Sequence, residues 1–319
     1  MLAVGGLVLL SAAPAGAADG YPSKDVQIVV PNEPGGGLDL VARMLAKGIT
    51  GPLGQSVIVL NRSGASGNVG TASVARAEAD GHTLLLTGVG HLVSPLLHSR
   101  PGYEPLNDFV PVAKIADAPN VLVVHESLKG LGLKALLDDP RSRHGGLAFA
   151  SAGYGHSSHL AAEVMMSRTG ARWLHVPYRG TGPATKGLAA GDVQLMFIPA
   201  GSVQAVLTTG KVQALAVAHP SRLASLPAVP TLAELGVEGA DFSQWYGLFA
   251  PAGTPDAVVQ RLHEAAARFR AEPESVRLMS VQGLEPSTLD RAAFADFLAV
   301  QSRRLATLVK QQGVQGTGH

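Results

Sequence analysis

The chain has no cysteine among its 319 residues, so disulfides, thiolate metal sites and cysteine nucleophiles are excluded. Charged residues are also few, at 15%, and they nearly cancel to a formal net charge of +1. That balance gives no electrostatic argument for nucleic acid or an anionic membrane surface as a partner. Apolar residues make up 46%, which provides a sizeable core for one large or two medium domains.

Sequence motifs of several enzyme classes are missing too. The glycine-rich stretch at residues 35–37 has neither the GxGxxG dinucleotide fingerprint nor the Gly-Lys-Ser/Thr of a P-loop. No G-x-S-x-G nucleophile elbow occurs. We therefore expect a protein that holds a small molecule without transforming it, with no cofactor and no metal.

The first 18 residues have the pattern of a signal peptide. Residues 2–13 are apolar, and Ala15-Gly16-Ala17 supplies small residues before a cut near Ala18. This predicts export to the periplasm of a Gram-negative type cell. No basic segment precedes the apolar run, so a start upstream of Met1 is left open. The alternative is a membrane anchor or a core helix, although the run is shorter than the ~18–20 residues of a span.

Further along, strand-like and helix-like runs alternate. The predicted strands are 26–30, 57–60, 83–87, 109–115, 120–125, 147–150, 173–178, 193–197 and 214–218. The predicted helices are 38–49, 68–77, 133–138, 157–168, 183–190, 202–209, 255–270 and 292–311. Residues 116–119 separate the two strands before and after them. This alternation predicts an α/β fold with a parallel or mixed sheet covered by helices on both faces.

The chain also contains candidate boundaries between two lobes. A crossing near residues 119–125 and a return near 241–247 make the first lobe discontinuous, over 19–121 and 245–319, with the second over 122–244. Ligands of such sheets bind beyond the carboxyl ends of the strands, where the glycine-rich loops fall. Trp245-Tyr246-Gly247 is interpreted as a packed hinge rather than a ligand-stacking site.

Four strand-to-helix junctions carry the candidate binding residues. Each aims unpaired backbone N–H groups of a helix N-terminus at one region, and such ends attract anions. The alternatives are tight turns with capping residues, in particular with Asp39 as a capping acid. In these four junctions the candidates are Pro34, Gly35, Gly36, Gly37 and Asp39; Ser66, Gly67 and Asn68; Ser151, Gly155, His156, Ser157 and His159; and Tyr178, Arg179 and Thr181.

Two other chemistries remain open at the third junction. His156, His159 and Glu163 fall at helical spacing, which is compatible with a metal site, although no further ligand cluster is apparent. A serine and a histidine there also permit a weak nucleophile pair.

Taken together, several segments carry a resemblance to a known family. They are YPSKDVQIVVPNEPGGGLDLVARMLA, VIVLNRSGASGNVGTASVARAEADGHTLLL, FASAGYGHSSHLAAE, HVPYRGTGPATKGLAAGDVQLMF, GKVQALAVAHPSRLASLPAVPTLAELG and WYGLFAPAGTP. In this order and spacing the chain resembles the Bug family, the substrate-binding proteins of tripartite tricarboxylate transporters. The resemblance covers nearly all residues from 21 to about 312.

The resemblance implies a two-lobed periplasmic binding fold (type II-like) with a carboxylate-bearing ligand in the cleft between the lobes. It places Pro34 to Gly37 and Asp39 at a first-lobe carboxylate site beside Ser66 to Asn68, with Thr87 lining the cleft. It also implies a monomer that closes on its ligand and docks on membrane transporter subunits. The residues that would form the second-lobe wall are Ser151, Gly155, His156, Ser157, His159, Tyr178 and Thr181.

Two positions depart from the family pattern. The first loop commonly reads Pro-Phe-x-Pro-Gly-Gly, and here Asn32 and Glu33 follow Pro31. A Glu33 carboxylate pointing inward would repel an anion; one pointing outward would not. Many members carry an aspartate after the residue equivalent to Phe197, where this chain has Ile198. The hypothesis is a ligand with an apolar or aromatic distal part.

Two other functions remain open at this stage. The first is a periplasmic sensor that presents its closed form to a signalling receptor. The second is a His-dependent hydrolase or metal enzyme. A cytosolic effector domain fits less well, because of the signal-like start.

Overall fold

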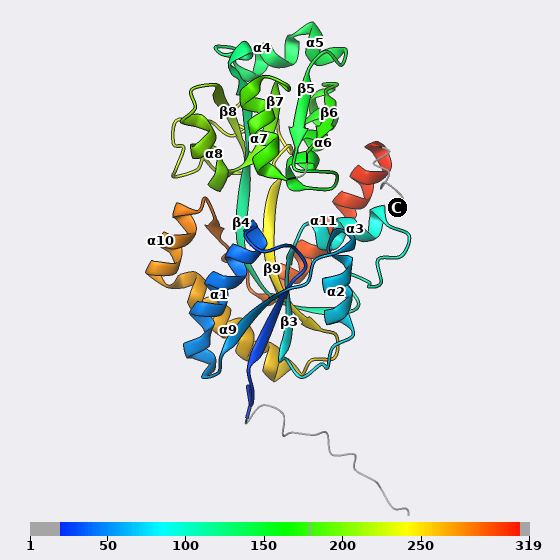
Figure 1. Ribbon diagram of the computed structural model, residues 1–319, viewed down its shortest axis with the longest axis vertical. Coiled ribbons are helices and arrows are strands. Elements are labelled where there is room, and N and C mark those ends of the chain that lie inside the picture. The colour runs from blue at the N-terminus through cyan, green and yellow to red at the C-terminus, as the bar shows by residue number, and fades with distance from the viewer. Residues whose placement is uncertain (1–19, 179, 313–319) are drawn as a thin grey trace, which may run out of the picture.

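The computed structural model describes residues 20–178 and 180–312, with the backbone alone for the last two. The predicted signal peptide, residues 1–18, lies outside the described residues. Within the described ranges, no helix has the length and hydropathy needed to cross a membrane. The described chain forms two lobes arranged along the long axis of the molecule (Figure 1).

The lobe that begins the chain is built on the parallel strands β1, β2 and β3. β1 lies between the other two, and its Val29 stands opposite Leu60 of β2 and Leu85 of β3. β-branched and leucine side chains on these strands pack against helices on both faces. The elements of this lobe are β1 (Val26–Val30), α1 (Gly37–Leu53), β2 (Val57–Asn61), η1 (Ala65–Gly67), α2 (Asn68–Ala75), β3 (Thr83–Gly88), α3 (Gly90–Leu97), β9 (Ser243–Pro251), α9 (Asp256–Ala271), α10 (Pro273–Val281) and β10 (Glu285–Pro286).

The second lobe repeats this arrangement around β5. β5 pairs in parallel with β6 and β7. Its elements are η2 (Glu126–Leu128), α4 (Leu133–Asp138), α5 (Pro140–Arg143), β5 (Ala148–Ser151), α6 (Ser157–Thr169), β6 (Leu174–Pro177), α7 (Thr181–Ala190), β7 (Leu195–Pro199), α8 (Ala200–Leu207) and β8 (Val212–Ala218). α6 ends at Gly170, whose φ of 70° suits a left-handed helix cap.

One long strand, β4 (Phe109–His125), belongs to both lobes. Its first part pairs with β9 as far as Pro119 opposite Ser243, and from Asn120 onward it pairs with β7 and β8. The two strands expected at 109–115 and 120–125 are thus wrong as separate elements. Residues 116–119 stay extended because β9 supplies a partner for each, and Pro119 sits where that ladder ends. The lobe boundaries after residues 121 and 244 stay predictions.

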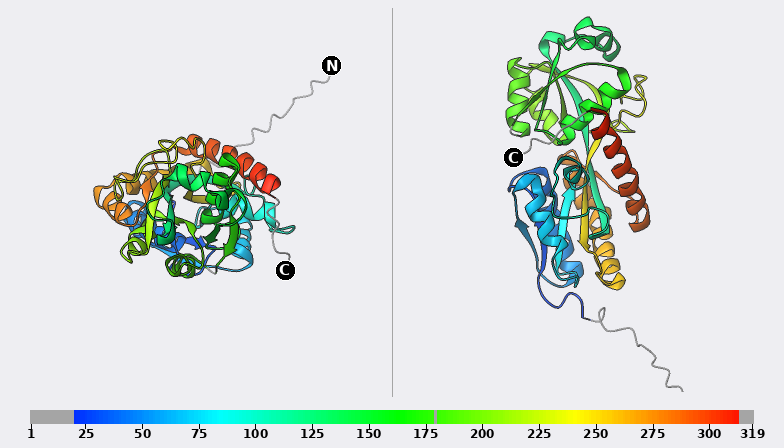
Figure 2. Two further views of the ribbon diagram at one scale, coloured as in Figure 1. Left: turned by 90° about the horizontal axis from the view of Figure 1, so that it is seen from above. Right: turned by 90° about the vertical axis from the view of Figure 1, so that its right-hand side faces the viewer.

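The last helix, α11 (Arg291–Gln312), connects the lobes along one side. It packs against α3 and β4 and also reaches α6 in the second lobe. Figure 2 shows it running beside the first lobe with its C-terminal end near the second. Phe294 and Leu305 of α11 lie in one buried cluster that also holds Leu85 and Phe149, one from each lobe. A shared apolar core thus joins the lobes on this side.

Most predicted elements agree with the structure to within two or three residues. Helices α3, α5 and α10 and strands β9 and β10 were not predicted from the sequence. Trp245 is packed, since it is 1% exposed and its ring meets Phe297 of α11 edge-on at 5.8 Å between centroids; its role as a hinge stays a prediction. β9 was overlooked because its apolar residues run without alternation next to two prolines and several glycines.

Candidate functional site

The start of α1 follows the carboxyl end of β1 and faces the other lobe (Figure 1). Its N-cap residue is Gly36, which offers no side chain to the first-turn N–H groups. Those of Gly37, Leu38 and Asp39 therefore have no intrahelical acceptor. Gly35 before them has φ +85°, a conformation that favours glycine. This junction provides the uncapped helix start that the sequence predicts.

Asp39 braces this loop from inside. Its Oδ2 accepts hydrogen bonds from the Gly35 N–H at 2.9 Å and from Arg43 Nε at 3.0 Å, and Arg43 Nη2 lies 2.9 Å from Oδ1. The hydrogen bond from Arg43 is the main cause that lowers the pKa of Asp39. Asp39 is therefore an ionised, paired carboxylate that holds the loop before the helix and leaves the first-turn N–H groups of α1 uncapped.

The other carboxylate of this loop, Glu33, is exposed at the surface. Its Oε1 accepts a hydrogen bond from the hydroxyl of Ser63. The Glu33 carboxylate thus has a hydrogen-bond partner within its own lobe.

The loop before α2 adds a second uncapped turn beside the first. Ser66 takes φ +57°, which is uncommon for a residue other than glycine. Asn68 is buried and accepts a hydrogen bond from Ser94 of α3 at 2.7 Å, so its side chain holds α3 in place. Gly67 lies against the backbone of Pro31, where an added Cβ would be 3.2 Å from the carbonyl oxygen. The β1 and β2 loops are therefore in contact.

Thr87 lies near these loops, at the carboxyl end of β3. It is buried and stands opposite Gly247 of β9.

In the second lobe, the loop before α6 is held by its own side chains. Ser158 Oγ accepts from the Ala152 N–H at 3.0 Å, and His159 Nδ1 accepts from the Gly155 N–H at 3.2 Å. Ser151 Oγ accepts from the Gly153 N–H at 3.1 Å. These bonds fix the loop. The His159 N–H donates to the carbonyl oxygen of His156 at 3.0 Å, so the N–H groups of Ser157 and Ser158 are left as the free donors of the first turn of α6.

The loop of α6 also reaches across to the first lobe. A Cβ added at Gly155 would lie 3.3 Å from the side chains of both Val93 and Leu97 of α3. His156, the N-cap of α6, is exposed and makes no cap hydrogen bond. The start of α6 is therefore placed where the two lobes meet.

A stack of rings lies behind this loop, and sequence reasoning missed one member, His175. The rings of His159 and His175 stack at 4.1 Å between centroids, and Phe149 stacks on His175 at 4.8 Å. Burial, with the nearby His159, lowers the pKa of His175 to about 4. Ser151 Oγ lies 2.6 Å from His175 Nε2, but Ser151 has no exposed surface. The pair therefore supports the loop and offers no nucleophile to a substrate.

The remaining predicted residues lie in the loop between β6 and α7, at the start of α7 and on β7. Tyr178 packs against Gly187, where a Cβ would lie 2.3 Å from the phenol oxygen. Burial and Asp192 raise the pKa of Tyr178. Thr181 begins α7 behind the N-cap Gly180, and Arg179 lies outside the described residues. Ile198 is fully buried in the second-lobe core, so it offers no atom to a ligand in this structure.

Tyr246 was not among the predicted binding residues, yet its hydroxyl lies at the start of α1. A Cβ added at Gly37 would be 2.5 Å from the Tyr246 oxygen. From the sequence, Trp245-Tyr246-Gly247 was interpreted as a packed hinge rather than a ligand-stacking site.

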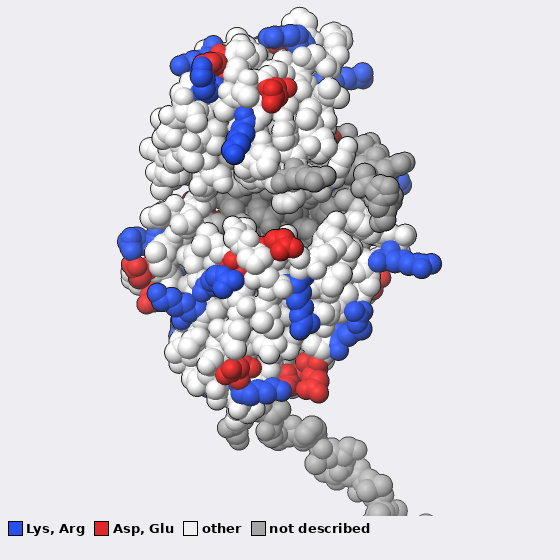
Figure 3. All heavy atoms as spheres, viewed as in Figure 1, with Lys and Arg blue, Asp and Glu red and all other residues white. Residues whose placement is uncertain are grey.

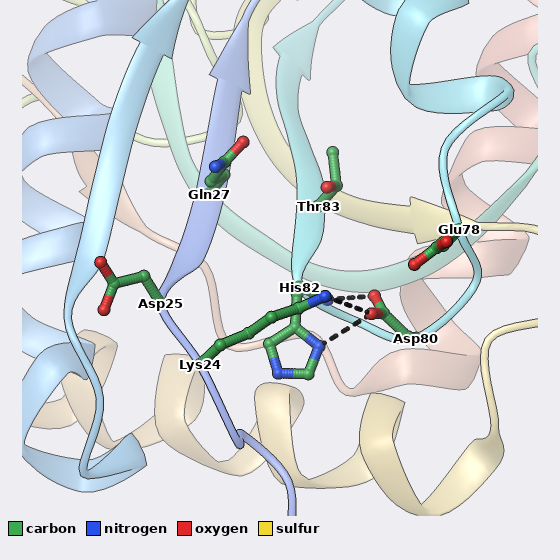
Figure 4. Close-up of a pocket in the computed structure, with 7 residues that line it drawn as sticks. All are labelled: Lys24, Asp25, Gln27, Glu78, Asp80, His82 and Thr83. Atoms are coloured by element: carbon green, nitrogen blue, oxygen red, sulfur yellow. Dashed lines mark hydrogen bonds and ion pairs between the residues drawn. The ribbon is translucent and has the colours of Figure 1, made fainter.

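Among the described residues, no group of three or more His, Cys, Asp or Glu side chains is arranged to hold a metal ion. A hollow of about 590 Å³ lies elsewhere, at the amino ends of β1 and β3 (Figure 4). There Asp80 is paired with Lys24 and with His82, each at 3.2 Å. Because the Asp80 carboxylate already has Lys24 and His82 as partners there, we assign the site to the opposite ends of the strands.

Two lobes joined by a shared strand, with glycine-rich loops where they meet, define the two-lobed class of solute-binding proteins. The model of the tripartite tricarboxylate transporter family receptor matches residues 41–314. The chain belongs to this family, and the resemblance to the Bug proteins is confirmed.

Curated relatives of known sequence include BugT of Bordetella pertussis, 35% identical over 99% of this chain and 98% of the relative. A UPF0065 protein from the tcbD-tcbE intergenic region of Pseudomonas sp. strain P51 is 37% identical over 91% of this chain and 87% of its own length.

Solved structures agree with the fold. The periplasmic binding protein BugD is 35% identical with a TM-score of 0.77, over 92% of this chain and 99% of its own. Rpa4515 of R. palustris, solved with adipate, is 32% identical with a TM-score of 0.80, over 92% and 98%. MatC of Rhodopseudomonas palustris, solved with bound malate, is 30% identical with a TM-score of 0.77, over 91% and 100%.

Proposed function

We propose that this protein captures a small carboxylate-bearing ligand between its two lobes and delivers it to a membrane transporter of the tripartite tricarboxylate type. The observation that carries the proposal is the pair of uncapped helix starts, α1 in one lobe and α6 in the other, on the sides of the lobes that face each other. Free N–H groups and the helix dipole make each start a site for an anion.

The ligand class rests on relatives. The solved structures of two proteins at least 30% identical to this chain contain adipate and malate, which are both dicarboxylates. A ligand with two charged ends would bridge the two helix starts. Bridging favours the closed form, because the ligand then gains contacts in that form only.

The remaining parts of the proposal concern location and chemistry. We place the protein in the periplasm, after removal of residues 1–18, acting as a monomer and without a cofactor. The site holds no exposed nucleophile next to a base, since Ser151 is buried behind its loop. Binding and release, rather than a reaction, fit these residues.

A thermal unfolding screen of the refolded, ligand-stripped protein tests the proposal. The probes are adipate, malate, citrate and benzoate, with adipamide as the uncharged control matched in length. A ligand that binds only the folded state raises the unfolding temperature with its concentration. The proposal predicts a rise with at least one carboxylate and none with adipamide; no rise with any carboxylate would contradict it.

A pair of variants at the start of α6 identifies the donor. Ser157→Pro removes the first-turn N–H at a position where proline suits a helix, after the extended His156 with φ −67° and ψ 154°. Ser157→Ala keeps that N–H and serves as the control. We expect the proline variant to bind the active carboxylate about 10-fold more weakly than the alanine variant. Equal affinities would remove α6 from the binding site.

A further inference from the structure

Tyr246 stands on β9, the strand that returns the chain from the second lobe to the first. It faces Gly88 of β3 in the ladder, one position from the Thr87–Gly247 pair. Its ring belongs to the core of the first lobe, and only 6% of its surface is exposed. The side chain is therefore held by packing, and its hydroxyl has a fixed position.

That position is the first turn of α1. A methyl group added to Gly37, the first residue of the helix, would overlap the phenol oxygen at 2.5 Å. Only glycine allows the hydroxyl to approach the backbone so closely. The free N–H groups of this turn and the phenol O–H thus converge on one place at the carboxyl end of β3.

The hydroxyl of Tyr246 forms no hydrogen bond with any residue in the described ranges, and burial is the one cause acting on its pKa. Two other buried tyrosines do have hydrogen-bond partners. Tyr21 donates to the carbonyl oxygen of Gly81 at 2.7 Å, and Tyr103 donates to that of His91 at 3.1 Å. Buried tyrosine hydroxyls usually find such a partner. The unused donor of Tyr246 is therefore left for a molecule from outside the chain.

We propose that the Tyr246 hydroxyl and the first-turn N–H groups of α1 together bind one carboxylate oxygen of the ligand, which makes Tyr246 a ligand-binding residue. The inference rests on the proposed function and adds to it a donor on the strand that joins the lobes.

The chemistry of these groups selects the ligand end they bind. Burial raises the pKa of Tyr246 to about 12, so the phenol keeps its proton at any physiological pH and acts as a donor. The neighbouring carboxylate, Asp39, is neutralised by Arg43. A positive helix end and a protonated phenol bind an ionised carboxylate and disfavour an ammonium group.

The location of Tyr246 also connects binding to the hinge. The preceding residue, Trp245, pairs with Asp117 of β4 and packs against Phe294 and Phe297 of α11. A ligand held by Tyr246 therefore contacts the strand next to the point where β4 passes from one lobe to the other. Contact at this place ties the ligand to the elements about which the lobes would move.

Tyr246→Phe tests the inference, because it removes one oxygen and keeps the ring. Tyr103→Phe is the matched control, since it removes a hydroxyl of the same kind that is bonded inside the protein. Affinity for adipate and for malate would be measured by titration calorimetry and stability by urea unfolding. We expect Tyr246→Phe to weaken carboxylate binding about 10- to 100-fold, the effect of a hydrogen bond to a charged group, with little loss of stability. Tyr103→Phe should show the reverse: lower stability and unchanged affinity.

The outcomes separate the inference from the function. Wild-type binding with equal affinity in Tyr246→Phe would overturn the inference and leave the proposed function standing. Failure of the wild type to bind either dicarboxylate would overturn both. A second readout is the ultraviolet difference spectrum of tyrosine on ligand addition, which should be present in the wild type and in Tyr103→Phe and absent in Tyr246→Phe.

Discussion

Gly201 is the position where one added methyl group tests the contact between the lobes. It lies in the first turn of α8 in the second lobe and touches the segment between α10 and β10 in the first. A Cβ on Gly201 would be 2.1 Å from the carbonyl oxygen of Gln282 and 3.0 Å from its carbonyl carbon. Both atoms are backbone, so no side chain can rotate away. The Gly201→Ala variant must therefore move the two segments apart.

The size of the effect follows from these distances. Real Cβ atoms essentially never approach closer than 3.0 Å, so the backbones must separate by about 0.9 Å. Overpacking of this kind costs about 1–3 kcal/mol. Replacing glycine by alanine in a helix returns at most about 1 kcal/mol. The expected net change is a loss of about 0–3 kcal/mol in the free energy of unfolding.

Gly51→Ala is the matched control. Gly51 is an exposed residue of α1, and a Cβ there meets nothing within 4 Å. It should therefore gain up to about 1 kcal/mol. Urea unfolding would compare the two variants, and small-angle scattering would compare their radii of gyration. We expect Gly201→Ala to be less stable than Gly51→Ala and more open. Equal stabilisation with an unchanged radius would refute the predicted contact between the lobes.

Two further predictions concern pH and the α1 loop. Burial lowers the pKa of His91 to about 4, below its ordinary value near 6.5. Between these two pH values the unfolded chain binds more protons than the folded protein does. The free energy of unfolding should therefore fall by a few kcal/mol as the pH drops from about 6.5 to about 4. Urea unfolding of the wild type and of His91→Phe should show a weaker acid dependence in the variant; the same slope would contradict this. Asp39→Asn should lower the free energy of unfolding by about 1–3 kcal/mol at pH 7 and by less at pH 3. The reason is that the lowered pKa of Asp39 stabilises the folded protein, and this stability is lost as the pH falls through the pKa of the folded state. Equal losses at both pH values would disprove it.

Much of the fold could be predicted because hydrophobic periodicity is local. The α1 and α6 helices and their glycine-rich starts were identified from residues within one segment. The helix starts were also found, since glycine before an apolar period is a local signal.

The features that could not be predicted from the sequence depend on contacts between distant segments. β4 stays extended through residues 116–119 because β9, more than 120 residues later, lies beside it, and no local pattern states this. Tyr246 was missed for the same reason, because its hydroxyl meets Gly37 only after β9 and β3 pair. From the sequence, Asp39 is compatible with a ligand contact or a cap, and its bonds with Gly35 and Arg43 depend on a side-chain orientation that the sequence does not state.

The central claim is that a carboxylate binds between the two lobes, whose charged side chains lie scattered over both lobes on the face in Figure 3. The decisive measurement is a crystal structure of the protein with the carboxylate that stabilises it most in the unfolding screen. The account predicts density for a carboxylate at the start of α1, within hydrogen-bonding distance of the Tyr246 hydroxyl, with the rest of the ligand directed toward α6. Ligand density in the hollow around Asp80 and His82, with both helix starts empty, would contradict it.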